Sequence, residues 1–172
     1  ENKGDDWEEK TLNEISENLD RQRVPITKKD RKEGKIPYYG ASGIVDYVQG
    51  FLFDEDLLCI SEDGANLLAR TYPIAFSISG KTWVNNHAHI LRFDNTISQY
   101  FVEYYLNSIK LGDFVSGMAQ PKLNQTKLNT IPIPFPNSIR EQEKLVLKLD
   151  ALTAETKKLK AIYTQKIADL EE

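Results

Sequence analysis

The last 35 residues constrain the fold of this 172-residue chain more than any other part of it. Pro134 and Pro136 prevent a helix before them, and Ser138 followed by Glu141 forms a capping box. No proline or glycine follows, so the sequence predicts one uninterrupted helix of about 52 Å over residues 138–172. A compact domain of this size is only about 30 Å across, so the rod must project from its neighbour or wrap over it.

Apolar residues recur along this segment at steps of three and four, the pattern of a helix that packs against another helix. Thr156 and Lys166 interrupt the pattern, so the stripe is not a pure leucine zipper. We expect a partner helix to cover it; the alternative is that the rod folds back on its own domain. The leucines expected in the pairing are Leu145, Leu149, Leu152, Leu159 and Leu170, and the stripe also includes Ile162 or Tyr163 and Ile167.

The residues before the rod favour a mixture of helices and short strands. Trp7, Leu12, Ile15 and Leu19 have roughly helical spacing, which predicts an opening helix over residues 7–19. Short β-like runs separated by glycine-bearing turns follow between Gly34 and Phe93. The runs are Ile44–Val48, Leu57–Ile60, Ile74–Ile78, and Thr82–Val84 continuing into His89–Phe93.

A second helix is expected over residues 98–110, with Ser98 as its N-cap. A loop over residues 117–124 and an extended, proline-locked run over residues 131–136 come next. The fold class is therefore α+β. A globular mixed α/β domain with short strands spans residues 1–137, and the long helix over residues 138–172 follows as a coiled-coil spacer.

Composition excludes several classes of protein. The chain is 40% apolar and 28% charged, which is globular rather than disordered. No apolar stretch approaches the roughly 18 residues of a membrane span, so no membrane association is expected. The single cysteine, Cys59, excludes an internal disulfide framework and a cysteine-based zinc site, and fits a reducing cytoplasm. Because the chain begins with Glu1 rather than Met, we expect a processed or excised piece.

Sequence motifs of catalysis are missing. There is no phosphate-binding loop, no dinucleotide-binding glycine motif and no nucleophile elbow. His87 and His89 alternate in a strand-like run, which predicts that both point to one face, where a carboxylate could complete a metal site. Without a third ligand in the motif, hydrogen-bonding histidines near a sheet end are favoured, and Glu62-Asp63-Gly64 indicates an ordinary turn. We expect no catalytic residue, metal or cofactor.

Local charge differs from the net charge of −4. Between Arg21 and Lys32, six cations are opposed only by Asp30, and such a cluster can follow a phosphate backbone. The alternative is a solvated loop. Three polar strings that contain glycine add amide, lysine and tyrosine side chains, which can pair with base edges or pack on sugars and bases. The strings are Lys35–Gly43, Gly80–His87 and Gly117–Asn124.

Several strings, taken in order, resemble the specificity (S) subunit of type I restriction-modification systems. The resemblance covers nearly the whole chain, as one target-recognition domain followed by one conserved helix. It rests on Trp7 with Leu12 and Ile15, Tyr38–Val45, Glu62–Ala65, Trp83–His89, Gly117–Asn124, Ile131–Pro134 and Glu141-Gln142.

This resemblance implies a non-catalytic reader of double-stranded DNA. It also implies docking to two adenine methyltransferase (M) subunits and, in restriction, to the motor-nuclease (R) subunits. Such subunits have two recognition domains and two long helices and read a bipartite site; here there is one of each. A second half is therefore expected, from another copy or from a longer chain. The rival classes are a structural adaptor that recruits a partner through the rod, and a metal-dependent hydrolase built on His87 and His89.

The residues expected on the DNA fall into two groups. Hydrogen-bonding groups in the turn-like strings are expected to read bases, whereas flexible cations are expected to contact phosphates. The base-reading group is Ser42, Lys81, Asn85, Gln120 and Asn124. The residues expected to contact phosphates are Lys28, Lys29, Arg31, Lys32 and Lys122.

Overall fold

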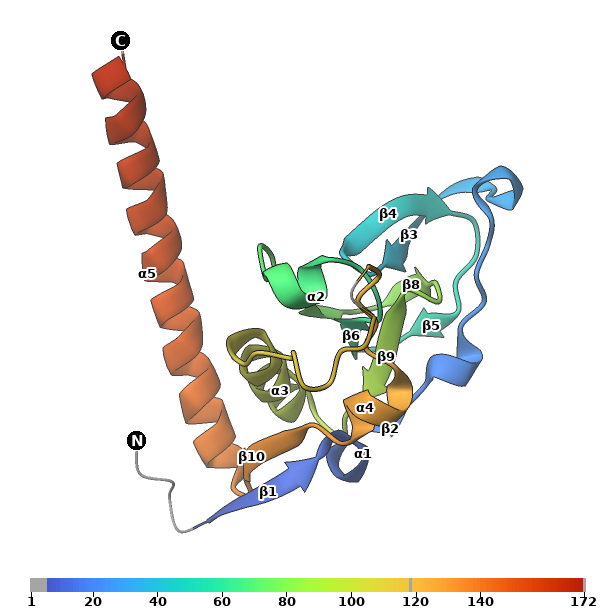
Figure 1. Ribbon diagram of the computed structural model, residues 1–172, viewed down its shortest axis with the longest axis horizontal. Coiled ribbons are helices and arrows are strands. Elements are labelled where there is room, and N and C mark those ends of the chain that lie inside the picture. Colours follow the sequence, from blue (N-terminus) through green and yellow to red (C-terminus); the bar gives the residue numbers. More distant parts are fainter. Residues whose placement is uncertain (1–5, 118, 172) are drawn as a thin grey trace.

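A computed structural model describes residues 6–117 and 119–171 of the chain. Figure 1 shows short strands and small helices gathered into one body, from which a single long helix extends. This is the α+β architecture that the sequence predicts. Residues 1–5, Met118 and Glu172, which the expected segments include, lie outside the described residues. Within the described part, no helix combines the length and the apolar character that a bilayer span requires.

In residues 6–117 and 119–171 the strands form three small sheets. The first pairs β1 (Trp7–Thr11) with β10 (Pro132–Pro136) in antiparallel register. The second has the order β2 (Glu17–Asn18), β9 (Ala88–Arg92), β6 (Leu57–Ser61) and β7 (Ala75–Ile78), and all its neighbours are antiparallel. The third has the order β4 (Gly43–Val48), β3 (Glu33–Gly40), β8 (Lys81–Val84) and β5 (Phe53–Asp54), with β3 and β8 parallel. The expected runs over residues 44–48, 57–60 and 74–78 correspond to β4, β6 and β7.

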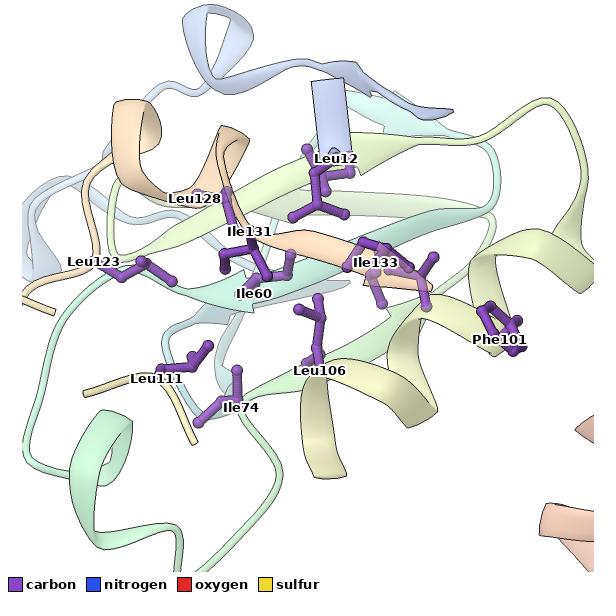
Figure 2. Packing of buried hydrophobic residues seen from close by; sticks show 14 of the residues in the cluster. Leu12, Ile60, Ile74, Phe101, Leu106, Leu111, Leu123, Leu128, Ile131 and Ile133 are labelled. Carbon is purple, nitrogen blue, oxygen red and sulfur yellow. The ribbon is translucent and has the colours of Figure 1, made fainter. Parts of the chain in front are cut away.

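Strand β6 is buried along its whole length because apolar clusters cover both of its faces. The larger cluster, part of which Figure 2 shows, joins β6 to α3 (Thr96–Ser108), α4 (Gln125–Asn129) and β10. The smaller cluster includes Cys59 and Ile90. Cys59 is a core residue as expected, and burial raises the pKa of its thiol. Two short helices, α1 (Leu12–Ile15) and α2 (Asn66–Ala69), complete the body.

The long helix α5 (Ile139–Glu171) matches the predicted rod and begins inside the globular part. Gln142 is fully buried, where its side chain donates to Pro136 O at 2.7 Å and accepts from Ser98 Oγ at 2.7 Å. Trp7 Nε1 donates to Glu141 Oε1 at 2.8 Å. These bonds fix the direction in which the helix leaves the body, because they tie its first turn to α3, β10 and β1.

The opening helix predicted over residues 7–19 is wrong. Strand β1 takes the first part because it pairs with β10, more than 120 residues away in the sequence. Helix α1 begins only at Leu12, where Thr11 and Glu14 form a capping box. It ends at Ile15, and the Ser16 hydroxyl donates to Leu12 O at 2.6 Å. The apolar spacing read as one long helix therefore belongs to a strand, one helical turn and a second short strand.

Two smaller predictions are also corrected. The N-cap of α3 is Asn95, whose side chain accepts from Ser98 N, while Ser98 lies inside the helix. The run over residues 82–93 is two strands in different sheets rather than one. A turn over residues 85–87 separates them, and Asn85 Oδ1 accepts from His87 N at 2.8 Å. This turn breaks the alternation, so His87 is exposed whereas His89 is buried.

Candidate DNA interface

Three strings that are far apart in the sequence meet at one cleft of about 360 Å³. The turn after β6, the turn before β9 and the loop before α4 each supply part of its wall. Some of the lining side chains are small, which leaves the cleft open, and others are polar. Its lining residues are Asp63, Gly64, Ala65, His87, Ala119, Gln120, Pro121 and Lys122.

His87 stands between this cleft and a neighbouring hollow of about 250 Å³. The hollow is lined by the segment Pro25–Thr27, Arg31, Tyr38 and the turn over residues 85–87. The Nδ1 atom of His87 lies 2.8 Å from Asp63 Oδ2, so the carboxylate fixes the ring and leaves Nε2 directed away from it. His87 was not among the residues expected to contact DNA. The signal for it was its position in the same string as Asn85.

A buried charge network lies beneath the cleft. Asp20, Glu62 and His89 bring a carboxylate or ring atom within 4.8 Å of one another. Arg23 Nη1 lies 2.6 Å from Glu62 Oε2, and its Nη2 lies 3.6 Å from Asp20 Oδ2. Lys122 Nζ lies 3.0 Å from Glu62 Oε1 at the rim. Arg23 and Lys122 already neutralise these carboxylates, so the cluster is built as an ion-pair network and does not fit a divalent metal.

His89 joins this network to the loop over residues 117–124. Its Nδ1 lies 2.6 Å from Asp20 Oδ2, and its Nε2 lies 2.7 Å from Leu123 O. Each ring nitrogen therefore faces a hydrogen-bond acceptor. Two backbone bonds tie the same loop to the end of β6, from Leu123 N to Glu62 O at 2.8 Å and from Gly64 N to Pro121 O at 3.0 Å. The loop that carries Gln120 is thus attached to β6 and β9 through Pro121 and Leu123.

The network keeps its two carboxylates ionised. Burial alone would raise the pKa of Asp20, but the hydrogen bond from His89, the charges of His89 and Arg23, and the bond from Ile90 N lower it overall. Burial likewise opposes ionisation of Glu62, and the bonds from Arg23 and Lys122 outweigh it, so the pKa of Glu62 is also lowered. Glu62 was expected to be part of an ordinary turn. Instead it is an anchor of the cleft.

The expected base-reading residues do not all lie together. Gln120 lines the cleft, and Asn85 lines the neighbouring hollow as a buried residue that shapes the 85–87 turn. Asn124 is the N-cap of α4 and accepts from Lys127 N at 3.0 Å. Ser42 lies 3.1 Å from the Tyr72 hydroxyl, at a separate hollow formed with Ile44 and Phe76. Lys81 has its ammonium 4.8 Å from the ring centroid of Phe51.

The residues expected to contact phosphates also do not all lie together. Lys28, Lys29 and Lys32 are exposed on and beside a single turn of 3-10 helix over residues 28–30. Arg31 instead lies over the Tyr38 ring, donates to Ile26 O at 3.1 Å and pairs with Asp46 Oδ2 at 3.0 Å. Its guanidinium therefore supports the segment that carries the three lysines. Arg23, another cation of this run, is half-buried and belongs to the network described above.

The apolar stripe of α5 has a half-buried first part and an exposed second part. Leu145 and Leu149 are half-buried, and Leu145 packs against the larger core cluster. From Leu152 onward the stripe is exposed, at 50% for Leu152, 53% for Leu159 and 86% for Leu170. The alternative in which the rod folds back on its own domain therefore holds only for the first turns. Figure 1 shows the remainder standing clear of the body.

Comparison with known proteins agrees with this architecture. Residues 4–169 match the family model described as type I restriction modification DNA specificity domain. A Haemophilus influenzae protein named as a type I restriction enzyme specificity subunit, S.HindORF215P, is 37% identical over 153 residues, covering 89% of this chain and 39% of that protein. This chain thus spans about two fifths of that relative's length.

Solved structures share the fold. The S subunit of a type I restriction-modification system from M. genitalium aligns with a TM-score of 0.70 and 14% identity, over 93% of this chain and 42% of that one. The HsdS subunit of Thermoanaerobacter tengcongensis aligns with a TM-score of 0.62 and 18% identity, over 94% and 41%. A chain from a structure of type I R-M complex assembly aligns with a TM-score of 0.74 and 16% identity, over 99% and 44%. By its family match and its relative, the chain belongs to the type I restriction-modification DNA specificity family.

Proposed function

We propose that this chain is one reading half of a non-catalytic specificity subunit. Residues 1–137 form the target-recognition domain, and residues 138–172 form the spacer that joins it to a second half. In the complete assembly it directs adenine methylation by M subunits, and cleavage by R subunits, to a bipartite DNA site. The observation that carries this proposal is the cleft around His87, where three polar strings meet close to the cationic segment over residues 25–31.

The chemistry of this surface suits duplex DNA. Gln120 offers an amide that can pair bidentately with adenine, and Lys122 offers an ammonium at the rim of the same cleft. The buried network fixes the loop that carries both residues, so the side chains are presented on a rigid backbone. Lys28, Lys29 and Lys32 supply exposed charge on the adjoining segment. Base reading and phosphate contact are thereby assigned to neighbouring parts of one face.

Removing the exposed lysines is expected to weaken binding to all DNA sequences alike. Each true phosphate contact that is lost should flatten the slope of log K against log salt by roughly 0.9. We therefore expect the triple variant Lys28→Ala, Lys29→Ala, Lys32→Ala to show a slope flatter by about 2–3 in the assembled complex. The exposed Lys110 lies two residues after the last residue of α3, and Lys110→Ala serves as the control. An unchanged slope in the triple variant would show that the run is only a solvated loop.

Substitution of a base-reading residue is expected to act on the cognate site alone. Gln120→Ala should cost about 1–3 kcal/mol on cognate DNA and leave binding to scrambled DNA unchanged. We expect the same pattern for Ser42 and Lys81. Asn85→Ala should also disturb the turn that it caps, and Asn124→Ala should also remove the N-cap of α4. Titration of both duplexes measures the difference, with Gln125→Ala as an exposed control. An equal loss of binding free energy on both duplexes would show that the residue contacts phosphates instead.

A further inference from the structure

The cleft around His87 is lined by one carboxylate, that of Asp63. In the part of the chain that the structure describes, its one ion-pair partner is the imidazole of His87, whose Nδ1 lies 2.8 Å from Asp63 Oδ2. The Asp63 side chain is 34% exposed. Duplex DNA carries about one negative charge per 1.7 Å of its axis, so an unneutralised carboxylate at this surface would repel it. DNA binding therefore favours a positive charge on His87.

The contacts of His87 hold its ring in one orientation. Its backbone N–H donates to Asn85 Oδ1 at 2.8 Å, and its carbonyl oxygen accepts from Glu62 N at 2.9 Å. An ionised carboxylate only accepts hydrogen bonds, so the Nδ1 atom beside Asp63 donates. The other ring nitrogen, Nε2, belongs to a side chain that is 52% exposed. This nitrogen accepts a hydrogen bond when the ring is neutral and donates one when the ring is protonated.

His87 lies where the two proposed DNA-contacting parts adjoin, because it lines both the cleft with Gln120 and the hollow with the segment over residues 25–27. A base amino group would suit a neutral ring, but that contact would leave Asp63 unneutralised beside the DNA backbone. A phosphate oxygen only accepts hydrogen bonds and therefore needs a donor. Building on the proposed function, we infer that His87 contacts a DNA phosphate as a protonated imidazole, with Nδ1 donating to Asp63 and Nε2 donating to a phosphate oxygen. A neutral imidazole has one N–H, which Asp63 already takes, so the contact requires one proton from the solvent.

The other charged and titratable groups around His87 already have partners among the described residues. Lys122 lies 3.0 Å from Glu62, Arg23 2.6 Å from Glu62, Arg31 3.0 Å from Asp46, and His89 2.6 Å from Asp20, while the Tyr38 hydroxyl accepts from Ile26 N at 3.0 Å. His89, the other histidine of the chain, is also buried. The proton taken up with the phosphate contact is therefore assigned to His87.

The pH dependence of DNA affinity in the assembled complex tests this inference. Binding to cognate and scrambled duplexes is titrated at constant ionic strength from about pH 6 to about pH 8.5, the range in which imidazoles titrate. His87→Gln keeps a neutral N–H donor but cannot take up a proton. We expect the parent complex to lose about tenfold more affinity than His87→Gln as the pH rises, and to do so equally on both duplexes. Uptake of one proton limits the difference to about one unit of log K per pH unit.

Replacement of the carboxylate gives a second, independent readout. In Asp63→Asn the amide nitrogen can donate to Nδ1, so that a neutral imidazole can carry its N–H at Nε2 and donate to the phosphate. We expect this variant to bind more tightly than the parent near pH 8.5 and to show a weaker pH dependence. Asp94 is exposed beyond the other end of β9, so Asp94→Asn is the matched control and should keep the pH dependence of the parent.

Two outcomes would overturn the inference. The same pH dependence in the parent and in His87→Gln would show that His87 takes up no proton on binding. A loss of affinity in His87→Gln that is confined to the cognate duplex would show that the residue reads a base. Both results leave sequence-specific recognition by the chain intact. Conversely, a parent complex that prefers no DNA sequence, but whose pH dependence is still reduced by His87→Gln, would retain the phosphate contact and contradict the proposed function.

Discussion

Replacement of both Leu152 and Leu159 by Asp is expected to abolish pairing of the two recognition halves and, with it, recognition of a bipartite site. Both side chains are about half exposed in the single chain, so the recognition domain should stay folded. In the pair, each aspartate would be an unpartnered charge inside an apolar seam, which costs about 3–5 kcal/mol. Two such charges should weaken association by 10²-fold or more. Sedimentation and circular dichroism measure assembly and folding in the same sample.

A matched control separates the seam from general effects of charge on the helix. Ala154 and Ala161 have the same seven-residue spacing and are exposed. The double variant Ala154→Asp, Ala161→Asp adds equal charge outside the stripe and should pair normally. If instead the Leu152, Leu159 variant unfolds the globular part, the helix is an integral part of that domain and not a spacer. If both variants pair normally, the stripe is not the contact.

Asp20→Ala is expected to lower the free energy of unfolding by about 3–5 kcal/mol, because it removes a buried carboxylate that His89, Ile90 N and Arg23 contact and breaks the network around it. Asp20 accepts from His89 Nδ1 and from Ile90 N, and lies beside Arg23. Denaturant titration measures the loss. Asp46→Ala removes a more exposed carboxylate that pairs with Arg31, and should cause a much smaller change.

The effect of Asp20→Ala should depend on pH with a defined sign. The pKa of Asp20 is lowered in the folded chain, so its stabilising contribution is complete above the ordinary aspartate pKa of about 4. That contribution is lost as the pH falls through the lower, native pKa. The difference in unfolding free energy between the parent chain and Asp20→Ala should therefore be constant near pH 7 and shrink in acid. A difference that grows in acid would show that the network does not stabilise the ionised carboxylate.

Local sequence patterns predicted the elements whose stability is local. The long helix α5 needs only its cap, its apolar spacing and the absence of proline and glycine, and α3 needs little more. Strands β4, β6 and β7 are short apolar or alternating runs between turn residues. The opening segment was predicted incorrectly because its partner, β10, comes from the other end of the recognition domain. Periodicity within residues 7–19 contains no information about that pairing.

The candidate site was predictable only in outline. Gln120 and Lys122 were expected on the DNA from residue chemistry, and both line the cleft. In the sequence, Arg23 and Arg31 look equivalent to the neighbouring lysines. In the structure, however, Arg23 pairs with Glu62 and Arg31 pairs with Asp46. Each of these contacts joins residues that are distant in sequence. Charge clusters in a sequence therefore show where cations occur but not which of them remain free to contact DNA.

The most direct test of the proposed function is the adenine methylation pattern of cells that express this chain with its methyltransferase subunits. Single-molecule methylome sequencing is compared between cells with the chain, cells without it, and cells with Gln120→Ala. We expect one bipartite adenine-methylated motif that appears only with the chain and that is weakened, or altered at one base, in the variant. The same motif at the same occupancy in all three cell lines would contradict the conclusion that this chain reads DNA sequence.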